Sequence, residues 1–279
     1  MPTSALPQRI AFIGAGNMTK AIMGGLLDTG VTPDQISAAD PFPEALAAVN
    51  AMGIENTSPA AQAVVSDADF VILAVKPQVM ADVCHDLSKA LNHKPVAMSI
   101  AAGITVNALR GRLDIPGLPI IRCMPNTPAL VRCGAAALFA PDGVSAQQRQ
   151  QAEAIMAAVG TTLWVEKESA LDAVTALSGS GPAYFFAFME AMISAGEQLG
   201  LTWDDAYQLT LQTALGSARL ATEQDQPVAT LRRNVTSPGG TTERALNAFA
   251  RGGLDNVVKQ AMDAAFARSQ ELSGEQGTS

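Results

Sequence analysis

The amino-acid sequence predicts an α/β protein in which a doubly wound sheet is followed by an all-helical part. Short β-branched runs alternate with stretches of helical period between residues 9 and 165, and a glycine-rich turn follows the first run. This alternation is typical of a parallel sheet covered by helices. Beyond Trp164 the strand-like runs end. We therefore expect two domains, at residues 1–166 and 167–279.

The predicted strands are short and apolar, and the helices between them repeat apolar residues every three or four positions. The strands cover residues 9–13, 36–39, 70–75, 95–100, 118–122, 135–139 and 162–165. The intervening helices cover residues 16–28, 44–52, 77–90, 106–112 and 145–159.

The second domain is predicted to consist of consecutive helices, at residues 169–177, 181–200, 203–223, 227–233 and 242–272. In residues 182–199 apolar side chains occupy almost every helical face, and a helix that is hydrophobic all round must be buried on all sides. A domain of this size can hardly surround such a helix alone. We therefore expect a second subunit to cover it.

Composition excludes several classes of protein. The chain of 279 residues has a net charge of -8, with 48% hydrophobic and 16% charged residues. Binding to nucleic acid needs clustered Lys and Arg, so no nucleic-acid partner is expected. The longest apolar run, residues 183–195, contains Glu190 and falls short of the roughly 20 residues of a membrane span, so no membrane partner is expected either.

The cysteines indicate a reducing compartment. Cys84, Cys123 and Cys133 are odd in number, lack a CxxC spacing and are too few for a disulfide framework or a zinc site. The first residues lack the features of a secretory signal. We expect a cytoplasmic protein without a bound metal.

The glycine-rich turn is a dinucleotide fingerprint in its proper context. Gly14 and Gly16 lie between an apolar strand and a helix in the first βα unit. Gly14 permits the tight turn, and Gly16 lets a pyrophosphate approach the N–H groups at the helix start. The third fingerprint position is Thr19, where Gly or Ala is usual, so helix–strand packing must tolerate a β-branched side chain. The first domain is thus expected to be of the Rossmann type.

Asp40 ends the second strand, at the place from which an acid reaches a ribose 2'-hydroxyl. This position favours NADH, and no Arg or Lys lies between Lys20 and Lys76 to bind the 2'-phosphate of NADPH. The alternative is that Asp40 only caps the turn formed by residues 41–43.

Five motifs together resemble the pyrroline-5-carboxylate reductase family in order and spacing over essentially the whole chain. They are GAGNM from Gly14, AVKPQ from Ala74, RCMPNTP from Arg122, SGSGPAY from Ser178 and VTSPGGTT from Val235. The resemblance implies a Rossmann domain that binds NADPH or NADH, and a helical domain that interlocks with a partner's to form a homodimer. Family members often assemble further, into pentamers of dimers.

The resemblance also implies where the cofactor binds. Expected contacts come from the fingerprint turn, from the end of the strand at residues 70–75, from Asn56 and from the loop that borders the nicotinamide. The residues are Gly14, Ala15, Gly16, Asn17, Met18, Asp40, Asn56, Ala74, Val75, Lys76, Pro77, Pro125 and Asn126. Lys76 could instead be a surface lysine, and Asn126 only a turn residue.

Reduction of the cyclic imine 1-pyrroline-5-carboxylate to proline is mainly a matter of positioning, because a protonated iminium already carries its proton. The loop before the last helix suits the substrate carboxylate, since its glycines expose backbone N–H groups. The expected substrate residues are Ser237, Gly239, Gly240, Thr241 and Thr242.

Three residues are candidates for a catalytic role. Thr242 can offer its hydroxyl to the ring nitrogen, as the matching family threonine is thought to do, or it can be a helix N-cap. Ser178 and Ser180 are expected to cap the long helix that follows them, with any catalytic role additional to capping. The active site is expected to combine elements of two subunits.

The sequence also bears on two other functions. A β-hydroxyacid dehydrogenase shares the two-domain plan but uses a lysine on its long helix, and residues 178–200 contain no lysine. A non-catalytic NAD(P)H-binding regulator would not need the substrate loop at residues 237–242.

Overall fold

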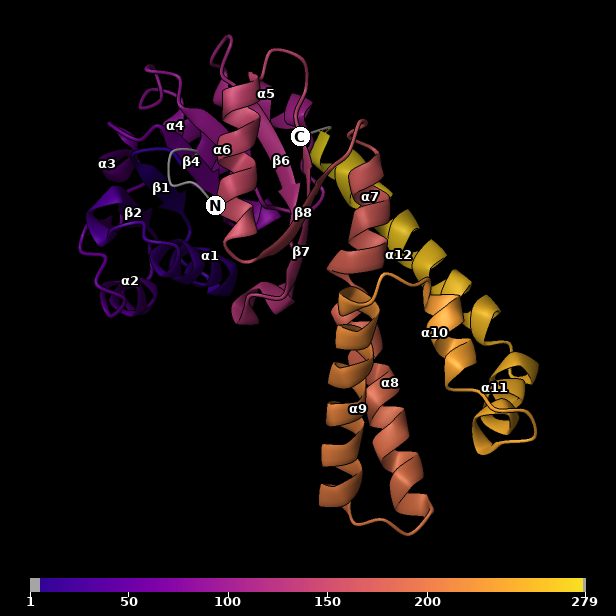
Figure 1. Ribbon diagram of the computed structural model, residues 1–279. Coiled ribbons are helices and arrows are strands. Elements are labelled where there is room, and N and C mark those ends of the chain that lie inside the picture. The colour runs from indigo at the N-terminus through magenta and orange to yellow at the C-terminus, as the bar shows by residue number, and fades with distance from the viewer. Residues whose placement is uncertain (1–5, 278–279) are drawn as a thin grey trace. The chain divides into compact units, whose positions relative to one another are not determined.

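The computed structural model describes residues 6–277, and a sheet of eight strands organises the N-terminal part (Figure 1). The strands are β1 (Ile10–Ile13), β2 (Ile36–Ala39), β3 (Thr57–Ser58), β4 (Phe70–Leu73), β5 (Val96–Ser99), β6 (Ile120–Met124), β7 (Gly134–Phe139) and β8 (Gly160–Trp164). All seven predicted strands are confirmed. The two-residue β3 was missed because it is too short to show a period.

The strand order is β3-β2-β1-β4-β5-β6-β7-β8, which is doubly wound about β1 and β4. Every neighbouring pair is parallel except β6 and β7, which are antiparallel. The sequence analysis expected a parallel sheet throughout. A parallel partner needs a long crossover connection, and only a short 3-10 turn joins β6 to β7, so the chain reverses there.

Helices cover the sheet and connect its strands. They are α1 (Asn17–Asp28), η2 (Pro33–Gln35), α2 (Pro43–Asn50), α3 (Gln62–Val65), η3 (Pro77–Val79), α4 (Met80–Leu87), α5 (Val106–Leu113), η4 (Thr127–Val131) and α6 (Ala146–Ala157). The helix predicted at residues 77–90 begins as the 3-10 turn η3, with Pro77 at its first position.

Both faces of the central strands are buried, which explains why these strands are continuous apolar runs. Ile10 and Phe12 of β1 lie in the core on one face of the sheet, whereas Ala11 and Ile13 lie in the core on the other face. Strand β4 repeats this alternation. The sheet is therefore a rigid support for the loops at the ends of its strands.

The C-terminal part is helical, as predicted. Its elements are α7 (Ala170–Val174), η5 (Thr175–Gly179), α8 (Gly181–Gln198), α9 (Trp203–Glu223), α10 (Val228–Asn234), α11 (Thr241–Arg251) and α12 (Leu254–Gly277). The single helix predicted at residues 242–272 is wrong. Gly252 and Gly253 divide it into α11 and α12, and Gly253 has a left-handed φ of 75°.

The chain divides into two compact units. The sheet unit comprises the residues up to Ser180 and those from Ala265 on, and the helical unit comprises Gly181–Ala264. The sheet unit thus includes α7, η5 and the last turns of α12 in addition to the strands. The functional division after residue 166 stays a prediction.

The helical unit buries few of its own side chains. Among α8–α11, the buried residues are Gly181, Ile193, Ala206 and Thr210. Helices α8 and α9 pack side by side (Figure 1), yet Phe185 is 68% and Leu199 is 87% exposed. Among residues 6–277, no helix is both long and apolar enough to cross a membrane.

Candidate functional site

The turn after β1 can be made only by a glycine. Gly14 has a φ of 100°, and its N–H donates to the carbonyl of Ala39 at 2.7 Å. A Cβ on Gly14 would lie 2.7 Å from the carbonyl oxygen of Ala74, so a side chain has no room. The turn therefore joins the carboxyl ends of β1, β2 and β4, where open α/β sheets bind ligands.

Gly16 has the opposite environment. It is the N-cap of α1, and a Cβ built on it would have no heavy atom within 4 Å. The protein itself does not require a glycine here, but a ligand that approaches the backbone would. The N–H groups of Asn17, Met18 and Thr19 begin α1 and point out of its first turn, which suits an anionic pyrophosphate.

Thr19 explains how the fingerprint tolerates its unusual third position. The side chain is 1% exposed, and its hydroxyl donates to the carbonyl of Gly14 at 2.7 Å. The buried hydroxyl is therefore satisfied, and it ties the first turn of α1 to the glycine turn.

Asp40 holds two backbone N–H groups at once. Its Oδ2 accepts from Ala15 at 2.8 Å, and its Oδ1 accepts from Phe42 at 2.9 Å. The second bond is the turn cap that was considered as the alternative role. The first bond links the carboxylate to the fingerprint turn. Each carboxylate oxygen keeps a further acceptor site, so the turn cap does not exclude a contact with ribose.

The segment after β4 completes this edge of the sheet. The N–H of Ala74 donates to the carbonyl of Ile13 at 2.8 Å, which places Val75 beside the fingerprint turn. A Cβ on Gly14 would lie 3.2 Å from Cγ1 of Val75. Lys76 is exposed and is the N-cap of η3, followed by Pro77. Asn56 precedes the edge strand β3 and is exposed, and its carbonyl accepts from Ala38.

Asn126 is held by both ends of its side-chain amide. It follows β6, and its Oδ1 accepts from the N–H of Ala135 at 2.8 Å. Its Nδ2 donates to the carbonyl of Ser178 at 3.0 Å. Asn126 is thus more than a turn residue, because it fixes the loop that begins with Pro125 to the SGSG segment.

The SGSG segment begins in a π-helical turn, η5, which ends at Gly179. Helix α7 continues through η5, and α8 begins at Gly181. The hydroxyl of Ser178 donates to the carbonyl of Val174 at 3.1 Å. Ser180 has right-handed helical dihedral angles, with φ -85° and ψ -19°. The expected N-cap role of Ser178 and Ser180 is therefore wrong, since a cap has extended backbone and accepts from a helical N–H.

An ion pair anchors the beginning of the segment that leads to this turn. Oε1 of Glu168 accepts from Arg122 at 2.9 Å and from the first N–H of α5, that of Val106, at 2.7 Å. The side chain of Arg122 is 8% exposed. Sequence reasoning gave Glu168 no role, because nothing in its neighbourhood is motif-like.

The loop before α11 uses its glycine N–H groups internally. The N–H of Gly240 donates to the carbonyl of Ser237 at 3.0 Å, and that of Gly239 donates to Oε2 of Glu243 at 2.9 Å. The expectation that these two N–H groups are unpaired is therefore wrong. Sequence reasoning missed Glu243, although an acid at the third position of a helix is a recognisable capping signal.

The first N–H groups of α11 itself remain available. Gly240 is the N-cap, so Thr241 and Thr242 are the first two helical residues. Among the described residues, their N–H groups and the hydroxyl of Thr242 have no hydrogen-bond partner. The alternative role of Thr242 as the N-cap is wrong. Its half-buried hydroxyl is free to meet a ligand.

Two of the three cysteines have thiols of low reactivity. Burial raises the pKa of the Cys84 thiol to about 11, and the Arg112 guanidinium acts in the opposite direction. Burial also raises the pKa of the Cys123 thiol, and Cys133 is exposed. Neither buried thiol is a nucleophile at neutral pH.

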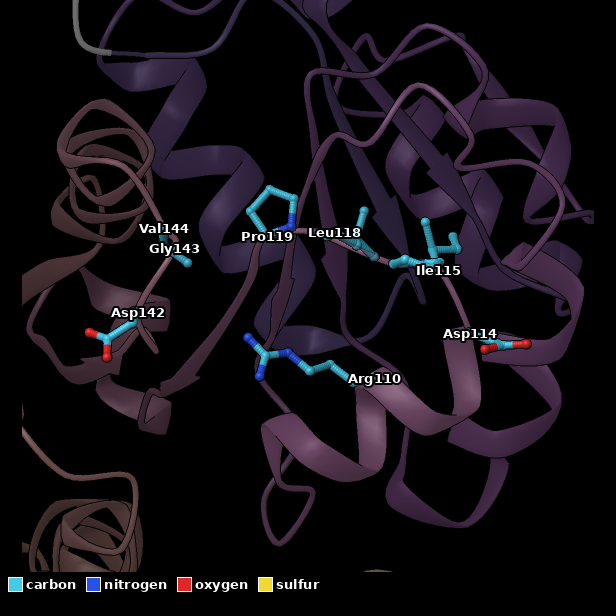
Figure 2. Close-up of a pocket in the computed structure, with 10 residues that line it drawn as sticks. Arg110, Asp114, Ile115, Leu118, Pro119, Asp142, Gly143 and Val144 are labelled. Carbon is cyan, nitrogen blue, oxygen red and sulfur yellow. The ribbon is translucent and has the colours of Figure 1, made fainter.

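A separate cavity of about 320 Å³ lies at the other end of the sheet (Figure 2). The lining comes from Arg110 of α5, from its C-cap Asp114, from the residues before β6 and from the loop after β7. In Figure 2 the side chain of Arg110 reaches across the opening towards the loop of Asp142. This is the amino end of the parallel strand β6, whereas nucleotides bind at the carboxyl ends, so the cavity is not the cofactor site.

Two family models match the chain. The model for pyrroline-5-carboxylate reductase dimerisation matches residues 168–272. The model for NADP oxidoreductase, coenzyme F420-dependent, matches residues 9–103. The first covers the helices after the sheet, and the second covers the fingerprint turn and β4.

Relatives match over nearly the full length. The chain is 50% identical to the pyrroline-5-carboxylate reductase of Pseudomonas aeruginosa, over 96% of this chain and 98% of the relative. It is 36% identical to that of Escherichia coli, over 96% and 99%. The structure of the enzyme from Coxiella burnetii matches with a TM-score of 0.91 and 42% identity, over 95% of this chain and 98% of that one. The Plasmodium falciparum structure with NADP bound matches with a TM-score of 0.83 and 27% identity, again over 95% and 98%.

Proposed function

The chain belongs to the pyrroline-5-carboxylate reductase family, and from this premise we propose which of its residues bind the cofactor and the substrate. It is an NAD(P)H-dependent oxidoreductase that reduces 1-pyrroline-5-carboxylate to proline in proline biosynthesis. Its residues must place the imine carbon near the nicotinamide and hold the substrate carboxylate.

The residues of the sheet unit fit a dinucleotide. The open space at Gly16 and the N–H groups of Asn17 and Met18 suit the pyrophosphate, and Gly14 and Ala15 shape the turn beneath it. Asp40 is proposed to face the adenosine ribose, together with Asn56, which precedes the neighbouring edge strand β3. The remaining proposed contacts come from the ends of β4 and β6. They are Ala74, Val75, Lys76, Pro77, Pro125 and Asn126.

The cofactor, when bound, supplies a hydride to the C=N carbon of the imine. Both NADH and NADPH are proposed to serve. The carboxylate of Asp40 accepts hydrogen bonds and therefore favours a ribose 2'-hydroxyl over a 2'-phosphate. Because Asp40 already holds Ala15 and Phe42, it cannot turn away without releasing two backbone N–H groups. NADH is accordingly proposed as the better cofactor.

The start of α11 is proposed to bind the substrate carboxylate. The N–H groups of Thr241 and Thr242 are unpaired among the described residues, and a helix N-terminus favours an anion. Ser237 is proposed to contribute its hydroxyl, because this group lies beside the start of α11. A Cβ built on the N-cap Gly240 would be only 2.7 Å from Oγ of Ser237. Gly239 and Gly240 are proposed to shape this loop.

Thr242 is proposed to orient the ring through its hydroxyl, which hydrogen-bonds to the ring nitrogen. No strong acid is needed, because the protonated iminium carries its own proton. Ser178 and Ser180 are proposed to act through the shape of the π-helical turn, since the hydroxyl of Ser178 is committed to Val174.

The chain self-associates through its dimerisation region. We propose that the unit of assembly is a homodimer, in which a second copy covers the apolar faces of α8 and α9. Further assembly into pentamers of dimers is proposed as well, and a measurement of the mass in solution tests it. No role for nucleic acid is proposed, because the net charge is -8.

The single observation that best supports the substrate assignment is the pair of open N–H groups at Thr241 and Thr242, which follow two glycines whose N–H groups are occupied. The test is NADH and NADPH oxidation with 1-pyrroline-5-carboxylate, compared with a β-hydroxyacid substrate. Oxidation with the imine alone supports the proposal. Oxidation with the hydroxyacid would favour the dehydrogenase alternative, and turnover with neither would favour a regulator.

A further inference from the structure

The hydrogen bond between Gly239 and Glu243 lies within the loop assigned to the substrate carboxylate. We propose that Glu243 is a positioning residue for this substrate: it holds the loop in the shape that leaves the N–H groups of Thr241 and Thr242 open. The inference rests on the proposed substrate site. It adds a residue that neither the family motif TSPGGTT nor the sequence analysis includes.

Two internal bonds define the shape of the loop. The bond from Gly239 to Oε2 of Glu243 is 2.9 Å long, and the bond from Gly240 to the carbonyl of Ser237 is 3.0 Å long. The first connects the residue before the N-cap to the third residue of α11. It resembles the returning half of a capping box, displaced by one position.

The loop needs such a tie because glycine does not fix its own conformation. Gly239 has a φ of 73°, and a Cβ built on it would have no heavy atom within 4 Å. Packing therefore does not hold Gly239 in place. A glycine without packing samples many conformations in solution. Among the described contacts, the carboxylate of Glu243 is what restrains the Gly239 N–H.

The acceptor oxygen matters more here than the negative charge. A carboxylate at the third helical position interacts favourably with the helix dipole, but it also repels a substrate carboxylate bound at the same terminus. A neutral side chain of the same length, with one carbonyl oxygen, would keep the tie to Gly239 and remove the repulsion. Glutamine meets both conditions.

The chain offers a matched control. Glu243 lines a cavity of about 380 Å³ together with Arg232, Arg233 and Asp255. Within the described residues, Asp255 makes no hydrogen bond to the loop. Removing either carboxylate changes the charge of the cavity equally. Only removal of Glu243 releases Gly239.

The experiment compares wild type with Glu243→Ala, Glu243→Gln and Asp255→Ala. For each protein, KM and kcat are measured with 1-pyrroline-5-carboxylate, together with KM for NADH. Inhibition by proline and by pyrrolidine, the same ring without a carboxylate, is then measured. We expect Glu243→Ala to raise KM for the imine and Ki for proline about fivefold. This factor corresponds to the loss of one hydrogen bond worth about 1 kcal/mol. KM for NADH and Ki for pyrrolidine should not change.

Glu243→Gln should restore the wild-type KM or lower it, and Asp255→Ala should behave as wild type. A lower KM in Glu243→Ala would overturn the proposal, because Glu243 would then be a competitor of the substrate. An equal rise in Ki for proline and for pyrrolidine in Glu243→Ala would also overturn it. So would a KM for the imine in Glu243→Gln as high as that in Glu243→Ala. If wild type does not reduce the imine at all, the proposed function itself is wrong, which is evident before any variant is compared.

Discussion

The side-chain amide of Asn126 donates to the carbonyl of Ser178, across 52 positions of sequence. Because Oδ1 of Asn126 also accepts from Ala135, one side chain fixes three segments: the end of β6, the start of β7 and the π-helical turn. Two of these segments carry residues of the proposed site, Asn126 and Ser178. Their relative position therefore depends on a donor and an acceptor carried by the same amide.

Asn126→Asp tests this relationship with a small chemical change. Aspartate keeps an acceptor for Ala135 but places a carboxylate oxygen against the carbonyl of Ser178. We expect the free energy of unfolding to fall by about 1–3 kcal/mol and kcat to fall as well. Asn92→Asp is the control, since Asn92 donates to the carbonyl of Lys89 at an exposed site. Equal effects of the two substitutions would contradict a role for Asn126 in the site.

Gly16→Val should abolish cofactor binding and leave the fold intact. The space around Gly16 is open in the protein, so a valine would clash only with the pyrophosphate. Titration of protein fluorescence with NADH and a thermal unfolding scan measure the two effects. Gly14→Ala provides the contrast, because its Cβ would lie 2.7 Å from a backbone oxygen and should destabilise the fold. Unaltered NADH binding by Gly16→Val would refute the nucleotide site.

Asp40→Ser should shift the ratio of catalytic efficiencies towards NADPH. At an effective dielectric near 20, two unit charges about 4 Å apart repel by roughly 4 kcal/mol, and exposure and salt reduce this to about 1 kcal/mol. A shift of about fivefold is expected. Asp40→Asn should shift the ratio in the same direction while keeping an acceptor for Ala15 or Phe42. An unchanged ratio in both variants would make Asp40 a turn residue alone.

Thr242→Ala should lower kcat/KM for the imine about two- to tenfold, the effect of one lost hydrogen bond of roughly 0.5–1.5 kcal/mol. The fold should persist, because among the described residues the hydroxyl has no partner inside the chain. Thr242→Ser keeps the hydroxyl and should retain most of the activity. Activity of the Ala variant within twofold of wild type would remove Thr242 from the site.

Glu168→Ala should destabilise the sheet unit by about 2 kcal/mol. Removing one partner of a buried pair costs roughly 3–5 kcal/mol, and the 26% exposure of the Glu168 side chain reduces this. Urea unfolding at fixed protein concentration measures the effect. Glu223→Ala breaks the exposed pair with Arg219 and should cost less than about 1 kcal/mol. Similar costs for both pairs would mean that Arg122 finds another partner.

The sequence predicted the strands well because buried parallel strands are continuous apolar runs with glycine or proline at their ends. The fingerprint turn was equally recognisable from the sequence. Gly14 has a backbone conformation that other residues rarely adopt, and a side chain at Gly16 would block the approach of a pyrophosphate. The reversal at β7, the π-helical turn and the roles of Glu168 and Glu243 were not predicted. The reversal at β7 and the role of Glu168 depend on contacts between different elements, which local periodicity does not record. The π-helical turn and the bond from Gly239 to Glu243 are local, but the period of the apolar residues shows neither a change of helix type nor a capping acid.

Because few side chains of the helical unit are buried, the stability of this unit is expected to depend on protein concentration. Four buried residues in α8–α11 cannot offset the conformational entropy of ordering these helices, so the energy must come from association. Folding of this unit is then a bimolecular event, and its midpoint rises with the logarithm of protein concentration. Dilution alone would melt α8 and α9 while the sheet, whose core is complete within one chain, stays folded.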